Sequence, residues 1–243
     1  MKTCGCSLTL QYTKLFAMKK NLLPLSLGFT TLLLTSACAH KYYTSSAFDQ
    51  QTAHHRTIAV LPAEMIFTGT APKNISPEEI EKIQETESKT FQYSLYNAIL
   101  RHANSRKYVT TISVQDVSTT QKLLEEKNIS IRDSWKEDDK KLAAILGTDA
   151  VVRLKVQKKR YMSDLASMGI GMGQQVLTRL GGIPMPVSDK TNDIYASCNV
   201  VSNNQTLWND NYQKSSNYNN PSEAVIDDIA DNFGRHFPYR KRR

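Results

Sequence analysis

The sequence lacks the motifs that mark the common catalytic and cofactor sites. It contains no Walker lysine motif, no Gly-x-Ser-x-Gly elbow and no His-Glu-x-x-His pair. Three glycines at 169, 171 and 173 do not match a dinucleotide-binding loop, because the third stands one position too early. The five histidines, at 40, 54, 55, 102 and 236, show no spacing of converging metal ligands. We therefore predict no catalytic residues, no metal ion and no cofactor.

Cysteine is also scarce, with four residues among 243: Cys4, Cys6, Cys38 and Cys198. Cys4 and Cys6 precede Met18, the expected start of translation, because residues 1–17 fit no signal-peptide layout. If residues 1–37 are removed and Cys38 is modified, only Cys198 keeps a thiol, and no intramolecular disulfide can form. Cys198 stands in an alternating apolar segment, which predicts a buried side chain rather than a reactive thiol.

The apolar segment near the amino terminus is shorter than the roughly 20 residues of a membrane-spanning helix. It runs over residues 22–34, follows a lysine pair at 19–20 and ends in Leu-Leu-Leu-Thr-Ser-Ala-Cys at 32–38. This layout resembles the lipobox of bacterial lipoproteins and predicts a signal peptide at 1–37 with a lipid on Cys38. Thr35 stands three residues before Cys38, where leucine is commonest. The alternatives are a signal peptide cleaved near Ala37 or Ala39, or an uncleaved anchor.

Processing before Cys38 leaves 206 of the 243 residues, a length that suits one domain with a sizeable core. It also removes four lysines and no acid, so the net charge falls from +8 to +4. Residues 38–56 are polar and lack a helical or strand period, which predicts a tether between lipid and domain. We expect the domain itself to span residues 57–237.

The domain is predicted to be α/β, with a mixed sheet of about five strands and helices packed on it. Apolar residues 57–61 before Pro62 indicate a buried strand, and Ser76 to Glu79 forms a capping box for a helix to about Ala103. Its first half, rich in glutamate and lysine, is expected to project into solvent or toward a partner. The later expected elements are strands at 108–113, 149–156, 194–201 and 206–212, and helices at 114–127, from a capping box at 134–137 to Gly147, and from 220 to Gly234.

An insertion rich in glycine and methionine is expected at residues 165–187. Glycine allows close backbone approach and methionine adapts to irregular apolar partners, so an interaction surface is predicted there. The alternative is a loop folded over the protein's own core. The candidate partner-binding residues are Met168, Ile170, Met172, Val176 and Leu177.

Three short motifs bring one family to mind: Ile-Ala-Val-Leu-Pro at 58–62, Leu-Gly-Thr-Asp-Ala-Val-Val at 146–152, and Leu207-Trp208 in the late hairpin. The chain resembles periplasmic lipoproteins of the curli-secretion-channel and TolB amino-terminal superfamily over about residues 57–237. The resemblance implies a non-catalytic adaptor in envelope biogenesis or secretion, with envelope proteins or further copies of the chain as partners. The alternative it implies is a subunit of an outer-membrane secretion channel, although two alternating hairpins of membrane-spanning length are missing.

The chain ends in a basic segment, residues 238–243, which is expected to be a solvated tail or a contact for anionic lipid headgroups. We predict a protein held to the membrane through the lipid on Cys38, at the periplasmic face of the outer membrane, because Ala39 is not the aspartate that retains enteric lipoproteins at the inner membrane. We predict no nucleic-acid partner, because a signal sequence removes the chain from the cytoplasm, and no small-molecule substrate.

Overall fold

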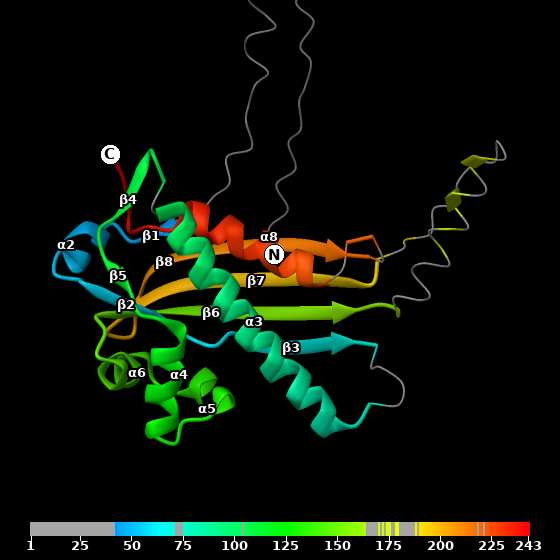
Figure 1. Cartoon of the computed structure of the whole chain (residues 1–243), viewed down its shortest axis with the longest axis horizontal. Coiled ribbons are helices and arrows are strands. Elements are labelled where there is room, and N and C mark those ends of the chain that lie inside the picture. The colour runs from blue at the N-terminus through cyan, green and yellow to red at the C-terminus, as the bar shows by residue number, and fades with distance from the viewer. Residues whose placement is uncertain are drawn as a thin grey trace, which may run out of the picture. The chain divides into compact units, whose positions relative to one another are not determined.

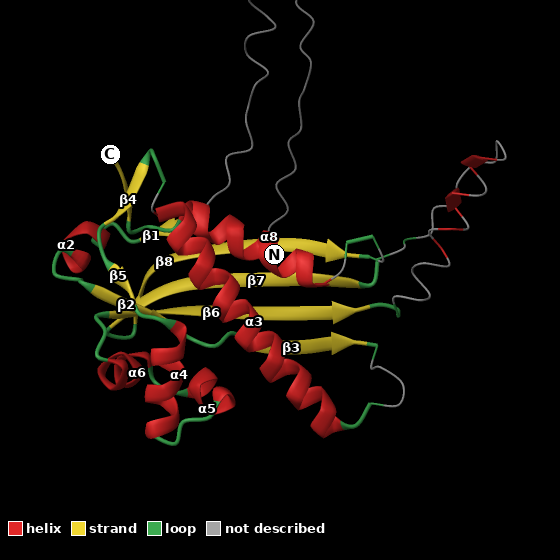
Figure 2. Ribbon diagram, in the orientation of Figure 1, coloured by secondary structure: helices red, strands yellow, loops and turns green. Residues whose placement is uncertain are grey.

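The computed structural model describes residues 42–70, 75–103, 105–163, 190–217, 219–220 and 222–243, with a few isolated positions between 170 and 188. These residues form a mixed α/β domain (Figures 1 and 2). The predicted fold class is confirmed. The strands are β1 (Tyr43–Thr44), β2 (Thr57–Val60), β3 (Glu64–Gly69), β4 (Tyr108–Thr110), β5 (Ser113–Val114), β6 (Ala150–Arg160), β7 (Asn192–Ser202), β8 (Gln205–Ser216) and β9 (Arg240–Arg242), and the helices are α2 (Phe48–Thr52), α3 (Pro77–Ala103), α4 (Val117–Glu126), α5 (Ile131–Lys136), α6 (Asp139–Leu146) and α8 (Ser222–His236).

The main sheet has seven strands in the order β1-β8-β7-β6-β2-β5, and β3 also pairs with β6. Strand β6 is central because it pairs parallel with β2 over residues 150–152, parallel with β3 over residues 155–160, and antiparallel with β7. Strands β4 and β9 form a separate antiparallel ribbon. The sheet therefore has more strands than the five expected.

Helices cover both faces of the sheet, and each face has its own apolar core. Helices α3 and α8 lie across one face of β6, β7 and β8 (Figure 2). Helices α4 and α6 pack on the other face at its β2 end, through Leu124, Leu142 and Leu146. Side chains alternate along a strand, so Ile58 and Val60 join the first core while Ala59 joins the second. This explains the continuous apolar run of β2.

Several local predictions are confirmed by the hydrogen bonds. The Ser76 hydroxyl accepts from the Glu79 amide at 3.2 Å, and the Glu79 carboxylate accepts from the Ser76 amide at 2.8 Å, which is the capping box of α3. The hairpin of β7 and β8 turns at Asn203 and Asn204, whose φ angles of 49° and 62° suit the right-handed strand twist. Gly147, with φ 65°, ends α6 in the left-handed conformation.

The predicted capping box at Ser134 is wrong. Ser134 lies inside α5, and its hydroxyl donates to the Ile131 carbonyl at 2.6 Å. The capping box belongs to Ser130 and Asp133 at the start of α5, and Asp138 caps α6 by accepting from the Lys141 amide at 3.0 Å. The sequence analysis did not identify the Ser130–Asp133 box, and the contacts of Arg153 with the carbonyls of residues 134, 135 and 137 fix the break between two short helices.

The predicted boundaries at both ends of the domain are also wrong. Residues 42–56 are not a tether, because β1 pairs with β8 and Phe48 of α2 is buried in the first core. Residues 238–243 are not a free tail, because Tyr239 is buried and β9 pairs with β4. The expected strand at 108–113 is likewise split between the ribbon and the edge of the main sheet. These elements are short and depend on distant partners.

The predicted signal peptide, Cys38 and residues 38–41 of the predicted tether lie outside the described residues, as does most of the 165–187 insertion. Within the described part of the chain, no helix combines the length and the apolar character that crossing a membrane requires.

Candidate functional site

A cavity of about 330 Å³ lies between the first half of α3 and the ends of β3 and β6. Apolar side chains contribute much of its wall, and charged and amide groups stand among them. The lining residues are Phe67, Thr68, Gly69, Thr70, Ile75, Ile80, Ile83, Gln84, Glu87, Lys158, Arg160, Met162 and Asn192. We call this space the β3–α3 cavity.

The pairing of β3 with β6 builds the floor of the cavity. Phe67 stands opposite Lys158 and Gly69 opposite Arg160. Gly69 has φ +88°, and a Cβ at this position would lie 2.2 Å from the Arg160 carbonyl oxygen. Only glycine fits this close approach, so Gly69 sets the position of Arg160 at the mouth of the cavity.

The first half of α3 forms the opposite wall. Ile80 and Ile83 line the cavity, one helical turn apart. On the neighbouring side of the helix, Arg132 of the α5 region lies 3.5 Å from Glu81 and 3.6 Å from Glu85. The prediction that this half of α3 projects into solvent is confirmed for most of its residues, including Lys82 and Ile83, whereas Glu81 and Glu85 contact α5. A contact with a partner stays a prediction.

Two cations of β6 give the cavity its electrostatic character. The Lys158 ammonium lies 2.7 Å from the Glu87 carboxylate, and both side chains are about four-fifths buried, with 16% and 20% of their surface exposed. The same ammonium lies 5.6 Å from the Phe67 ring centre. Among the described residues, the Arg160 guanidinium has one hydrogen bond, from Nε to the Met162 carbonyl at 3.5 Å, and no carboxylate partner. The cavity therefore presents one guanidinium with capacity for an anionic group.

Buried polar groups fix the start of β7 beside the cavity. The Asn192 amide donates to the Ser216 hydroxyl at 3.0 Å, and the Tyr161 hydroxyl donates to the Asp193 carboxylate at 2.9 Å. Burial alone would raise the pKa of Asp193, but hydrogen bonds from Ser215 and Tyr161 and the charge of Lys190 lower the pKa below its usual value. Asp193 is therefore ionised at neutral pH and anchors this end of the hairpin.

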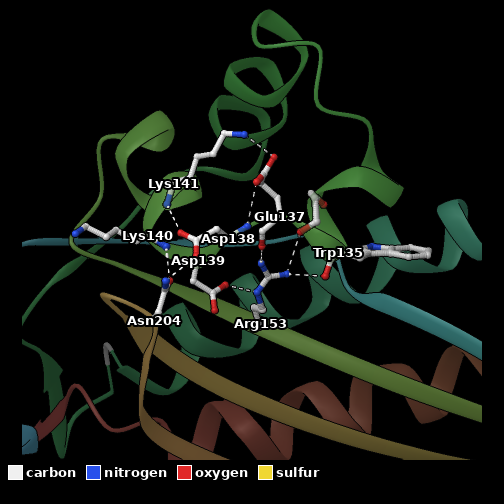
Figure 3. A network of polar contacts seen from close by, with 9 residues as sticks. Trp135, Glu137, Asp138, Asp139, Lys140, Lys141, Arg153 and Asn204 are labelled. Carbon is white, nitrogen blue, oxygen red and sulfur yellow. Dashed lines mark hydrogen bonds and ion pairs between the residues drawn. The ribbon is translucent and has the colours of Figure 1, made fainter.

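A second polar network surrounds Arg153 of β6 (Figure 3). Its guanidinium donates to the carbonyls of Ser134 at 2.9 Å, Trp135 at 3.2 Å and Glu137 at 2.5 Å, and forms an ion pair with Asp139. These partners lie at the end of α5 and the start of α6, so one side chain holds both helices on the sheet. Because its donors are used within the chain, this network is structural rather than a binding site.

The arrangement closest to a nucleophile and base joins Ser202 and His55. The Ser202 hydroxyl donates to the Asp149 carbonyl at 2.9 Å and is 3.4 Å from His55 Nε2, and His55 Nδ1 is 2.7 Å from the Tyr239 hydroxyl. Burial lowers the pKa of His55 despite the nearby charge of Asp149. The Ser202 proton is committed to a backbone carbonyl, so the cluster serves to fasten the carboxyl-terminal segment to the sheet.

Cys198 is fully buried, as predicted. Burial, followed by the charge of Asp210, raises the pKa of its thiol, so the nucleophilic thiolate is scarce at neutral pH. Within the ranges that the structure describes, no three His, Cys, Asp or Glu residues are placed to hold a metal ion.

The predicted site residues fall largely in segments without description. Cys38, Met168, Val176 and Leu177 lie outside the described residues. Ile170 is half-buried, and Met172 is exposed over 54% of its surface. A role in partner binding for these residues stays a prediction. The cavity residues were missed because they converge from β3, α3 and β6, and the apolar Met-Ile-Phe run at 65–67 was their only local signal.

No family model matches the chain, and no curated protein matches its sequence. Solved structures with similarity to this chain include the lipoprotein GNA1162 from Neisseria meningitidis, at 12% identity, with 74% of this chain and 94% of that chain covered and a TM-score of 0.42. The PelC dodecamer from Paraburkholderia phytofirmans has 8% identity, coverage of 80% and 93%, and a TM-score of 0.38. The LpoB C-terminal domain from Salmonella enterica has 10% identity, coverage of 67% and 84%, and a TM-score of 0.33. These similarities assign neither a family nor a function.

Proposed function

We propose that this chain is a lipid-anchored protein of the bacterial cell envelope that acts as a non-catalytic adaptor in envelope biogenesis or secretion. The lipobox-like segment ending at Cys38 supports the anchor. In this proposal the β3–α3 cavity binds an apolar peptide segment of an envelope partner that also carries a carboxylate.

The cavity carries the proposal because its chemistry suits binding. Ile80, Ile83 and Phe67 offer apolar contact, and Arg160 offers a guanidinium that has no carboxylate partner among the described residues. The exposed side chain of Ile83, at 39%, makes this wall accessible. Apolar anchors with one converging charge are typical of peptide-recognition grooves.

The polar groups of the cavity favour binding over catalysis. Lys158 and Glu87 neutralise each other at 2.7 Å, which leaves neither as a free acid or base. The remaining polar lining groups are amides, hydroxyls and a guanidinium, which donate and accept hydrogen bonds without an activating base beside them. The cavity therefore lacks a nucleophile–base pair among the residues described as lining it.

Site-specific photocross-linking in the native envelope tests this function. A photoreactive residue at Ile83 should form one dominant heterologous adduct, identified by mass spectrometry. The matched control is Tyr93, which is similarly exposed at 44% on the same helix but does not line the cavity. In a second step, Arg160→Gln should reduce the Ile83 adduct, because the partner loses its charge contact.

Equal adducts from Ile83 and Tyr93, or an Ile83 adduct unaffected by Arg160→Gln, would refute the cavity as the binding site. If intact-mass analysis of the purified protein shows no lipid on Cys38, the anchor is refuted.

A further inference from the structure

The carboxyl-terminal basic segment is part of an ordered ribbon. Strand β9 pairs with β4 in register, with Tyr108 opposite Arg242 and Thr110 opposite Arg240. The Arg243 amide donates to the Lys107 carbonyl at 3.0 Å, which extends the pairing beyond the strand. The Arg240 guanidinium lies 4.1 Å from the Tyr108 ring centre and is held there by a cation–π contact. The pairing therefore fixes the backbone positions of these cations, and the cation–π contact also holds the Arg240 side chain.

The ribbon gathers six cations, which we call the basic ribbon: Arg106, Lys107, Arg240, Lys241, Arg242 and Arg243. All except the half-buried Arg240 are exposed. None of the six forms an ion pair with a carboxylate of the described residues, whereas nearby Arg101 and Arg235 are paired with Asp231. An unpaired cluster of this size attracts anions and not neutral or cationic partners.

The basic ribbon lies at the end of the domain from which the chain leads back to Cys38. Figure 1 shows β4 and the carboxyl terminus at the same end of the sheet as β1. Tyr42 stacks on His236 at 5.8 Å, and Tyr42 and Arg240 line one hollow of about 360 Å³. Tyr42 and Tyr43 are also exposed, at 50% and 54%. Tyrosine favours the interface between lipid and water, where its ring is apolar and its hydroxyl is wet.

The corrected start of the domain shortens the link to the membrane. Three residues, 39–41, lie between Cys38 and Tyr42, and the four Cα–Cα steps of an extended chain span at most about 14 Å. A lipid on Cys38 would thus keep this end of the domain within about two Debye lengths of the headgroups. Attraction between the basic ribbon and anionic lipids acts over this range.

We propose that the basic ribbon, with Tyr42 and Tyr43, docks on anionic phospholipid headgroups and fixes how the domain stands on the membrane. The link length depends on the anchor in the proposed function, whereas the affinity of the ribbon for anionic membranes does not. Docking at this end leaves the β3–α3 cavity, at the opposite end of the long strands, accessible to a partner.

Vesicle cosedimentation with the processed chain, residues 38–243, tests the proposal. Cys38→Ser is introduced so that neither a lipid nor the apolar signal segment contributes, and the vesicles contain 30% phosphatidylglycerol in phosphatidylcholine. Lys241, Arg242 and Arg243 are replaced together by glutamine. Each cation near an anionic surface changes the partition coefficient roughly fivefold, so the triple variant should bind roughly 100-fold more weakly at low salt.

The matched control replaces three exposed lysines elsewhere, Lys82, Lys89 and Lys127, by glutamine. It has the same net charge, and we expect less than a fivefold change. Circular dichroism checks that both variants fold. Equal losses in the two triple variants, or binding to pure phosphatidylcholine as strong as to anionic vesicles, would overturn the proposal. Tighter binding to a 20-base-pair DNA duplex than to anionic vesicles would also overturn it, since the ribbon would then be a nucleic-acid surface. None of these results depends on whether Cys38 is acylated.

Discussion

Replacement of Arg153 by methionine should destabilise the domain. Methionine keeps a long unbranched side chain but removes three hydrogen bonds to the carbonyls of Ser134, Trp135 and Glu137 and the ion pair with Asp139. Hydrogen bonds to charged groups contribute about 1.5–3 kcal/mol each, and loss of one partner of a buried pair costs about 3–5 kcal/mol. The Arg153 and Asp139 side chains are 22% and 21% exposed, so water recovers part of the loss. We expect a decrease of about 2–4 kcal/mol in the free energy of unfolding.

Urea denaturation followed by circular dichroism measures this change. A loss of this size should lower the midpoint by roughly 1–2 M, and the melting temperature by roughly 4–16 °C. The control is Lys155→Met on the same strand. It removes an ion pair with Glu64 at 3.0 Å, in which the Lys155 side chain is 54% exposed. An exposed pair contributes about 0–1 kcal/mol, so this variant should unfold almost as the parent does.

Hydrogen exchange locates the effect. Amides of residues 131–146, in α5 and α6, should lose protection in Arg153→Met before those of β6 and β7 do, because the lost contacts join these two helices to the sheet. If Arg153→Met and Lys155→Met have the same free energy of unfolding within about 0.5 kcal/mol, the network does not hold the helices, and the reasoning is wrong.

Two further predictions concern Gly69 in the β3–α3 cavity and His55, which contacts Tyr239 of the carboxyl-terminal segment. Gly69→Ala should lower the free energy of unfolding, measured by urea denaturation, by about 1–3 kcal/mol, and by more than Gly147→Ala does. Both glycines have positive φ, but only at Gly69 would the new Cβ meet a backbone oxygen, at 2.2 Å. Equal losses of stability in the two variants would argue against the clash. His55 has a pKa below 6.5 in the folded protein, so the unfolded chain binds more protons and stability should fall as the pH decreases below about 6.5. His55→Phe should show a smaller decrease between pH 7 and pH 5 in thermal denaturation, and an unchanged pH slope would contradict the role of His55.

Local patterns in the sequence predict those elements that depend on neighbouring residues. The apolar run of β2 reports burial on both faces, the Ser76–Glu79 box starts α3, and Asn203 and Asn204 turn the long hairpin, because each feature depends on residues a few positions apart. Burial of Cys198 followed from strand alternation for the same reason.

Short segments that pair with partners far along the chain are placed by tertiary contacts. Strand β1 pairs with β8, β9 pairs with β4, and Arg153 selects the break between α5 and α6. The β3–α3 cavity also arises this way, because Phe67, Ile83 and Arg160 meet only when β3 joins β6 beneath α3. Such pairings are stabilised by contacts across the fold, and the sequence pattern of a segment of two or three residues is too short to predict its partner.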